Sequence, residues 1–256
     1  MPLTEDLLAS DPASYARATQ SRFLNAAAKG TVPKDVLGRW LANDRLYIHA
    51  YIKGVGRLLD ALDLPDIAST TTVAAVSSVP ERLLQWLIDA LVNVRREETF
   101  FVDTAARFGI EVNLPVSERG VVAPDEKLDG LRRFEKLFGG LSKGSEPLGW
   151  LEGAVLLYAT EKCYLDAWSH ARGALDTSAD GSRDADGGAL RKEFIPNWSS
   201  EEFKAFVDEL GAIIDQGFEE AVKKGEEGVE GSLRERALWV WGEVVLAEEA
   251  FWPALD

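Results

Sequence analysis

The chain of 256 residues is long enough to bury a sizeable core, and its 46% hydrophobic and 28% charged residues are typical of a folded globular protein rather than a disordered one. Its formal net charge is −15 at pH 7. A surface this acidic repels phosphate backbones, and no cluster of basic residues offsets the charge. The sequence therefore argues against nucleic-acid binding.

Nothing in the sequence predicts a membrane or secreted protein. No apolar run approaches the roughly 20 residues that a membrane span needs. Residues 1–12 are acidic, whereas a secretory signal is basic and then apolar. The single cysteine, Cys163, excludes an internal disulfide and fits a reducing compartment. We therefore expect a cytoplasmic protein with no membrane partner.

The N-terminal part of the chain begins with a short segment that has no clear pattern. We expect residues 1–10 to form a loose leader. Asp11 followed by Pro12 is a helix-starting pair. A second start follows at Pro33, from which apolar residues recur at three- and four-residue steps along one face of a long helix.

One carboxylate interrupts the apolar face of that long helix. Asp44 falls between Leu41 and Tyr47, where a buried side chain is expected. Burying an unpaired carboxylate costs several kcal/mol, so such a residue is usually paired, hydrogen-bonded or functional. Because Tyr47 and Tyr51 flank it, we interpret Asp44 as part of a pocket. The alternative is a structural ion pair with an Arg or Lys of another helix.

The rest of the chain alternates between helical patterns and loops, with no strand pattern of useful length and no repeat. Helices are expected at 11–30, 33–62, 67–76, 79–109, 125–141, 146–172, 199–224 and 232–252. The intervening connection at 110–124 is expected to be extended, and 173–188 to be a flexible surface loop. The segment 146–172 is apolar nearly all round, which predicts a central, buried helix. We predict an all-α, single-domain bundle of about eight helices that spans residues 1–256.

Four of the predicted helices carry a carboxylate on the apolar face. They are Asp44, Glu98, Glu161 and Glu248, and Glu97 is expected to point to a neighbouring face. Inward carboxylates in a bundle suggest either a di-iron site or a polar pocket for acid/base chemistry. The di-iron pattern needs a Glu three residues before a His, and neither of the two histidines, His49 and His170, has one. A relaxed metal site that uses Asp166 and His170 remains an alternative to a local hydrogen bond.

Cys163 could be a nucleophile only if a base lay beside it. His170 is seven residues further along the same helix, a rise of about 10.5 Å, so the two side chains cannot meet. A buried cysteine that packs as a small hydrophobe is the preferred interpretation. Tyr164, like Tyr47 and Tyr51, either packs in the core or stacks on a flat ligand.

Three segments, in the same order along the chain, resemble a known family. GTVPKDVLGRWLANDRLY (30–47), FIPNWSSEEF (194–203) and EEAFW (248–252) are similar to signatures of the TenA/thiaminase II family. That resemblance implies a haem-oxygenase-like all-helical fold. It also implies hydrolysis of a C–N bond in an aminopyrimidine related to thiamin, which salvages the pyrimidine. We add the expectation of a homo-oligomer that needs no cofactor and no metal.

The resemblance also implies roles for single residues. Asp44 would bind the amino group and a ring nitrogen of the pyrimidine, and Tyr47 would line the site. Glu248 would be the acid/base and Phe251 a ring contact. Tyr164 matches a tyrosine that lies one turn after the family nucleophile.

The nucleophile itself is not at its position in this sequence. The family cysteine falls on Thr160, with Cys163 three residues too late, and a tyrosine expected within 125–141 is missing as well. A second branch of the family lacks this cysteine and relies on a glutamate, so Glu161 becomes the candidate.

Our prediction is therefore a TenA-like hydrolase with two catalytic glutamates. The catalytic residues are Glu161 and Glu248, and the binding residues are Asp44, Tyr47, Tyr51, Thr160, Tyr164 and Phe251. Two alternatives stay open. One is a metal-dependent oxidase on the same fold that uses carboxylates with His49 or His170. The other is a catalytically silent relative that binds a small heterocycle or a partner.

Overall fold

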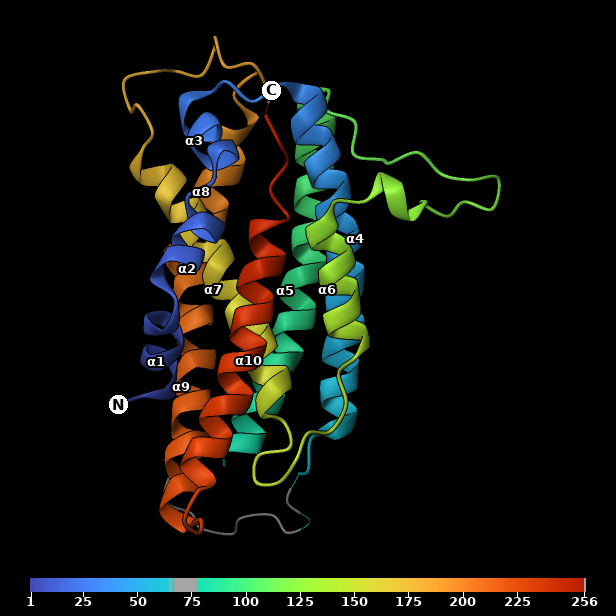
Figure 1. Ribbon diagram of the computed structural model, residues 1–256. Helices are drawn as coiled ribbons and strands as arrows, with labels where there is room; N and C mark the ends of the chain where they lie inside the picture. The colour runs from blue at the N-terminus through green and yellow to red at the C-terminus, as the bar shows by residue number, and fades with distance from the viewer. Residues whose placement is uncertain (65, 67–77, 256) are drawn as a thin grey trace.

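The computed structural model describes residues 1–64, 66 and 78–255, and these form an elongated bundle whose long helices run side by side (Figure 1). The long helices are α4 (Lys34–Ala61), α5 (Val79–Phe108), α7 (Leu151–Gly173), α9 (Glu201–Lys224) and α10 (Val229–Glu249). The shorter ones are α1 (Leu3–Ser10), α2 (Pro12–Thr19), α3 (Arg22–Lys29), α6 (Asp129–Gly139) and α8 (Ile195–Trp198). Within the described ranges the only β-pairing is an isolated bridge between Val116 and Val122. The predicted all-α bundle is confirmed.

Several helix ends lie where the sequence signals put them. Ser78 and Glu81 form a reciprocal capping box at the start of α5, and Gly109 ends that helix in the left-handed conformation that suits glycine. Ser200 caps α9 by accepting a hydrogen bond from the Phe203 backbone N–H. These local rules give the long helices their predicted lengths to within a few residues.

The predicted loose leader is wrong. Residues 3–10 form α1, whose Leu3 and Leu7 side chains are fully buried. Thr4 binds α9, because both its backbone N–H and its hydroxyl donate to the Asp215 carboxylate at 2.9 and 2.6 Å. Two leucines four residues apart are too short a pattern to reveal a helix, but they are enough to bury one side of it.

The predicted helix over 11–30 is two helices that meet at a break. α2 ends at Thr19, and Ser21 starts α3 by accepting a hydrogen bond from the Leu24 N–H at 3.3 Å. A serine cap competes with continuation of the helix, and the apolar pattern alone does not show this competition. α3 then ends at Gly30, where φ is +68°.

Three other predicted boundaries shift, and one prediction cannot be compared. α6 begins at Asp129 after a single 3₁₀ turn, and α7 begins at Leu151 after a loop that contains the cis Glu146–Pro147 bond. α10 runs from Val229 to Glu249, three residues short of the predicted end at 252. The last three residues of the segment EEAFW (248–252) therefore lie beyond the helix. The predicted helix over 67–76 lies outside the described residues.

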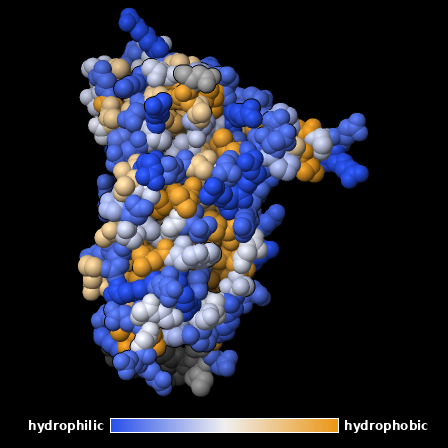
Figure 2. Space-filling model, in the orientation of Figure 1, coloured by the Kyte–Doolittle hydropathy of each residue, from blue (hydrophilic) through white to orange (hydrophobic). Residues whose placement is uncertain are grey.

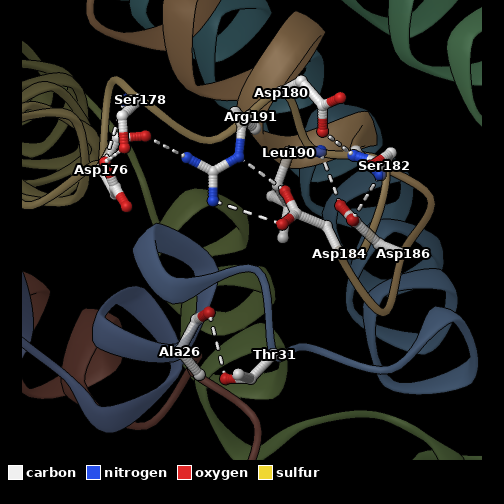
Figure 3. Close-up of polar contacts among 11 residues, drawn as sticks. Ala26, Thr31, Asp176, Ser178, Asp180, Ser182, Asp184, Asp186, Leu190 and Arg191 are labelled. Atoms are coloured by element: carbon white, nitrogen blue, oxygen red, sulfur yellow. Dashed lines mark hydrogen bonds and ion pairs between the residues drawn. The ribbon is translucent and has the colours of Figure 1, made fainter.

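The loop at 173–188 is irregular, as expected, but its second half is tied to the bundle (Figure 3). Arg191 donates to the Asp184 carboxylate at 2.7 Å and to the Asp176 carbonyl at 2.9 Å. The Asp186 carboxylate is buried and accepts the Leu190 N–H at 2.7 Å. These contacts fix the start of a π-helical turn, Leu190–Phe194, which leads into α8. Neither element was indicated by the sequence.

The centre of the bundle is α7, as its uniform apolar pattern predicted. It contacts α2, α3, α4, α8, α9 and α10. Beside it, α6 crosses α10 very closely, because a Cβ at Gly130 would lie 2.4 Å from the Ala247 carbonyl oxygen. The segment 111–126 projects from the side of the bundle (Figures 1 and 2). In the part of the chain that the structure describes, no helix is both long and apolar enough to cross a membrane.

Candidate functional site

A cavity of about 150 Å³ lies between α4, α5, α7, α8 and the start of α9, and we call it the site cavity. Its volume is roughly ten times the minimum that one water molecule needs, so it can hold a small ligand. Among the residues that line it are Asp44, Tyr47, Tyr51, Asn93, Arg96, Glu97, Thr160, Glu161, Tyr164, Asn197, Trp198, Glu202, Phe203 and Phe206. The lining is aromatic and acidic, and it combines side chains that are far apart in the sequence, from Asp44 to Phe206.

Asp44 reaches the site cavity from the middle of α4. Its side chain lies on the buried face of the helix, and the residue is 5% exposed. Burial raises the pKa of this carboxyl well above its ordinary 3.8, and the nearby charges of Glu97 and Glu161 raise it further. A group in this state can share a proton with a ligand that offers both a donor and an acceptor.

Glu161 reaches the cavity from α7, one residue after Thr160. The Tyr51 hydroxyl donates to Glu161 Oε1 at 2.6 Å, which fixes the carboxylate and favours its ionised form. Burial is the larger influence and raises the pKa of Glu161 to about 7. Near neutral pH this carboxyl is therefore present in both protonation states.

Glu248 lies on α10 beside Asp44 and Glu161 and is not itself part of the cavity lining. It is 3% exposed, and its Oε1 atom has no hydrogen-bond partner among the described residues. Burial first, and then the charges of Asp44 and Glu161, raise the pKa of Glu248 to about 8. A buried acid with an unpartnered oxygen can release or take up a proton with little rearrangement.

The predicted orientation of Glu97 on α5 is wrong. Glu97, expected on a neighbouring face, lines the site cavity and accepts hydrogen bonds from Asn197 and from the Trp198 indole. Glu98, expected on the inward apolar face, is buried, but it lies outside the cavity and pairs with Arg95 and His49. Over the 30 residues of this helix, the apolar stripe gradually rotates around the helix axis. The sequence alone therefore does not fix the direction in which a single residue points.

Three tyrosines form an aromatic wall beside the carboxylates. Tyr47, Tyr51 and Tyr164 all line the site cavity, and burial raises the pKa of each phenol well above its ordinary 10. Phe251 does not line it. It is buried behind Tyr47, at a ring-centroid distance of 5.9 Å, and makes an edge contact with Phe134. The predicted contact of Phe251 with a ligand therefore has no support from the cavity lining.

Neither Thr160, which stands at the position of the family cysteine, nor Cys163 is placed for nucleophilic attack. Thr160 lines the cavity, but its hydroxyl donates to the Leu157 carbonyl at 2.9 Å, so the proton is held by the helix itself. Cys163 is fully buried and lies outside the cavity lining, and burial raises the pKa of its thiol well above the ordinary 9.0. Neither side chain is therefore placed to act as a nucleophile toward the cavity.

Each residue of the predicted metal alternative has a hydrogen-bond or ion-pair partner elsewhere. The Asp166 carboxylate accepts the Tyr15 hydroxyl at 2.7 Å, and the His170 ring contacts Asn25 at 3.3 Å. His49 pairs with Glu98 rather than with a residue of the cavity. Over residues 1–64, 66 and 78–255, no group of three or more His, Cys, Asp and Glu side chains has the geometry of a metal site.

The sequence did not predict that residues of α8 and of the start of α9 line one side of the cavity. Asn197 and Trp198 lie in α8, directly before the Ser200 cap of α9. The segment FIPNWSSEEF (194–203), one of the three that resemble TenA-family signatures, could have pointed to these residues. Its contribution to the site depends on the loop contacts of Arg191, which sequence patterns do not reveal.

Comparison with known proteins identifies the fold. No protein-family model matches the chain. A TenA homologue from Pyrococcus furiosus superimposes with a TM-score of 0.68 at 23% identity, over 98% of both chains. A TenA family transcription regulator from a Silicibacter species superimposes with a TM-score of 0.67 at 11% identity, over 98% of this chain and 94% of that one. The chain therefore has a TenA-like fold, and the predicted haem-oxygenase-like bundle is confirmed.

One curated protein is similar at the sequence level. It is a probable transcription factor from Fusarium pseudograminearum, 26% identical over 272 residues. The alignment covers 94% of this chain and 51% of that protein. The chain thus spans about half the length of the curated relative that it matches.

Proposed function

We propose that the chain is a TenA-type hydrolase that cleaves a C–N bond on the side arm of an aminopyrimidine. The observation that carries this proposal is the pair of buried carboxyls beside the site cavity. The pKa of Glu161 is raised to about 7 and that of Glu248 to about 8, so between these values Glu161 is largely ionised and Glu248 largely protonated. One base and one acid at the same pH are what a hydrolysis needs.

The aminopyrimidine ring is proposed to bind between Asp44 and the tyrosine wall. An aminopyrimidine offers an N–H donor next to a ring nitrogen, and a carboxyl that carries a proton can pair with both. Tyr47 and Tyr164 supply flat apolar surface for the ring. The acidic lining favours a ligand rich in donors over an anionic one.

The proposed reaction uses water as the nucleophile. Glu161 accepts a proton from the water as its oxygen bonds to the side-arm carbon. The C–N bond breaks, and its electron pair stays with the departing nitrogen, which is protonated by Glu248. The products are an alcohol and an amine, and transfer of the proton from Glu161 to Glu248 restores the starting state. Tyr51 holds Glu161 in place through its 2.6 Å hydrogen bond.

A role in direct DNA binding is less well supported. Two of the similar proteins are described as transcription factor or regulator. Direct contact with DNA needs clustered lysine or arginine, and this chain has a net charge of −15. Figure 2 shows hydrophilic residues over most of the visible face, with apolar residues in gaps between them. Regulation, if it occurs, would then pass through a bound small molecule.

The alternative that a specific observation favours is a silent binding protein. Thr160 stands where the family has its cysteine, and its hydroxyl proton is held by a backbone carbonyl. A site that lost its nucleophile without gaining another base would still bind the ring. The metal-dependent oxidase is disfavoured because Asp166, His170 and His49 each bind another partner. We also propose a cytoplasmic location, since the one thiol of the chain is unpaired. Separately, we propose a homo-oligomer.

The test is a turnover assay with a panel of aminopyrimidines that carry amino-linked side arms. We expect the wild-type chain to release the amine and the alcohol in equal amounts. Glu161→Gln and Glu248→Gln keep the side-chain shape and should each lower the rate by at least about a hundredfold. Glu98→Gln, which changes a buried carboxylate outside the cavity, is the matched control and should stay within about threefold of wild type.

Two results would contradict the proposal in different ways. Tight binding of the ring without turnover by the wild type would favour the silent binder. Turnover that survives both glutamine variants would mean that other groups carry out the chemistry.

A further inference from the structure

Among the described residues that line the site cavity, two are exposed. The side chain of Arg96 on α5 is 66% exposed and that of Glu202 on α9 is 79% exposed. The rest of the described lining is buried or half-buried. A side chain that lines a cavity and also meets solvent must lie where the cavity reaches the surface. Arg96 and Glu202 therefore mark the mouth of the cavity.

An ion pair joins the two sides of this mouth. Arg96 Nη2 donates to Glu202 Oε1 at 3.1 Å, and the contact links α5 to α9. Glu202 lies in the first turn of α9, two residues after the Ser200 cap, where the helix dipole favours a carboxylate. The half-buried rings of Phe203 and Phe206 line the cavity along the same turns of α9. A ligand that enters between α5 and α9 thus has to pass the pair.

The pair is of a kind that opens easily. Exposed ion pairs contribute little to stability, because both side chains are well solvated and salt screens their charges. Arg96 also acts on a second carboxylate. Burial raises the pKa of Glu97, whereas hydrogen bonds from Trp198 and Asn197 and the charge of Arg96 lower it. When Arg96 leaves Glu202, the charge of Glu97 therefore remains close to it.

We propose that the Arg96–Glu202 pair is a gate across the mouth of the site cavity, which slows small ligands in both directions and leaves their affinity nearly unchanged. For the identity of the ligand, the inference rests on the proposed function. A ligand that lies wholly inside the cavity leaves the pair free to close behind it. The same barrier then applies to entry and to release, so removing it changes both rates by one factor.

The test is stopped-flow measurement of binding and release. The ligand is an aminopyrimidine with a hydroxymethyl arm, which is uncharged and has no C–N bond in the arm to hydrolyse. Glu202→Gln keeps the side-chain shape and removes the charge. We expect both rate constants to rise about threefold at low salt, or about 0.65 kcal/mol of barrier, and the dissociation constant to stay within about twofold. Position 202 is changed rather than 96, because Arg96 also acts on Glu97.

Ionic strength supplies a readout that a merely structural role would not move. Between about 0.01 M and about 1 M salt the screening length falls from about 30 Å to about 3 Å. The wild-type rates should rise with salt towards those of Glu202→Gln, and the rates of the variant should stay flat. Because the arm of the ligand is uncharged, its own attraction to the acidic cavity adds little to this response.

Two further variants serve as controls. Arg82 and Glu209 also join α5 to α9, at 2.6 Å, but neither of them lines the cavity. Glu209→Gln should therefore keep the wild-type rates and their salt response. Arg96→Glu combined with Glu202→Arg reverses the pair, and this double variant should restore the slow, salt-dependent rates.

The outcomes separate the gate from the proposed function. Unchanged rates in Glu202→Gln, a salt response that persists in it, or a change confined to the release rate would overturn the gate and leave the hydrolase intact. If the ligand binds neither wild type nor variant, the proposed function falls.

A probe that needs no substrate then decides the gate. Acrylamide is a small neutral quencher of tryptophan fluorescence, and the buried Trp198 lines the cavity. Glu202→Gln should increase the quenching, and this increase should disappear when Trp198→Phe is added. Equal quenching of wild type and Glu202→Gln would overturn the gate.

Discussion

Replacing Glu248 by glutamine should make the protein more stable at mildly alkaline pH. Burial and the charges of Asp44 and Glu161 raise the pKa of this carboxyl from the ordinary 4.5 to about 8. Between these two values the folded chain holds the proton and the unfolded chain does not, so the free energy of unfolding falls as the pH rises. Glutamine carries no titrating proton and removes this loss.

The size of the effect follows from the same interval. Each pH unit between 4.5 and 8 is worth about 1.4 kcal/mol, so the upper limit is about 5 kcal/mol. Asp44 and Glu161 titrate together with Glu248 and share part of that energy. The glutamine amide also meets a site without a donor for its oxygen, since Glu248 Oε1 has no partner among the described residues. We therefore expect a gain of about 2 kcal/mol at pH 8 and almost none at pH 5.

The assay is urea unfolding of wild type and variant at several pH values from 5 to 8. The difference between the two free energies of unfolding should grow steadily with pH. Glu81→Gln is the matched control: the capping box lowers the pKa of that exposed carboxyl below its ordinary 4.5, so folding does not make it hold a proton at pH 5 to 8 and the difference should stay nearly constant over this range. Parallel curves for Glu248→Gln and wild type would refute the assignment of Glu248 as a buried acid that stays protonated up to about pH 8.

Four further predictions can be checked with the same protein. The pH profile of kcat/KM should be bell-shaped, with apparent pKa values near 7 and 8 that belong to the pair Glu161 and Glu248, and a profile flat from pH 6 to 9 would contradict the acid/base pair. Asp44→Leu should weaken binding of an aminopyrimidine at least about a hundredfold by calorimetry, because leucine can neither accept from the amino group nor donate to the ring nitrogen; wild-type affinity in the variant would remove Asp44 from the site. Cys163→Ala should keep turnover within a few fold, whereas a loss beyond about a hundredfold, roughly 2.7 kcal/mol of barrier, would mean that the thiol takes part in the chemistry. Gly130→Ala should lower the free energy of unfolding by about 1–3 kcal/mol in a denaturant titration, since its Cβ would press on the backbone of α10, and an unchanged midpoint would show that the two helices can separate without cost.

Long-range periodicity and capping chemistry made most of the fold predictable. The apolar faces of α4, α5 and α9 extend over many turns, and residues such as Ser78, Gly109 and Ser200 mark their ends. The short helices could not be predicted in this way. α1 buries only two leucines, and the break between α2 and α3 depends on a single serine cap.

The site shows the same division between local and distant causes. Asp44 was found because a carboxylate interrupts an otherwise apolar stripe, which is a local signal. Glu97 was assigned to the wrong face, because its orientation is set by donors from Asn197 and Trp198, about a hundred residues further along the chain. Whether Phe251 touches a ligand could not be predicted either, since Tyr47 lies in front of it only after α4, α6 and α10 have packed.

The central claim is that this cavity breaks a C–N bond with water. The most direct test is to incubate the chain with an aminopyrimidine that carries an aminomethyl arm in water enriched in oxygen-18, and to analyse the products by mass spectrometry. The proposed mechanism predicts an alcohol that carries one heavy oxygen and one equivalent of ammonia, with both lost in Glu248→Gln. Recovery of the intact amine from a wild-type chain that binds it would contradict the claim.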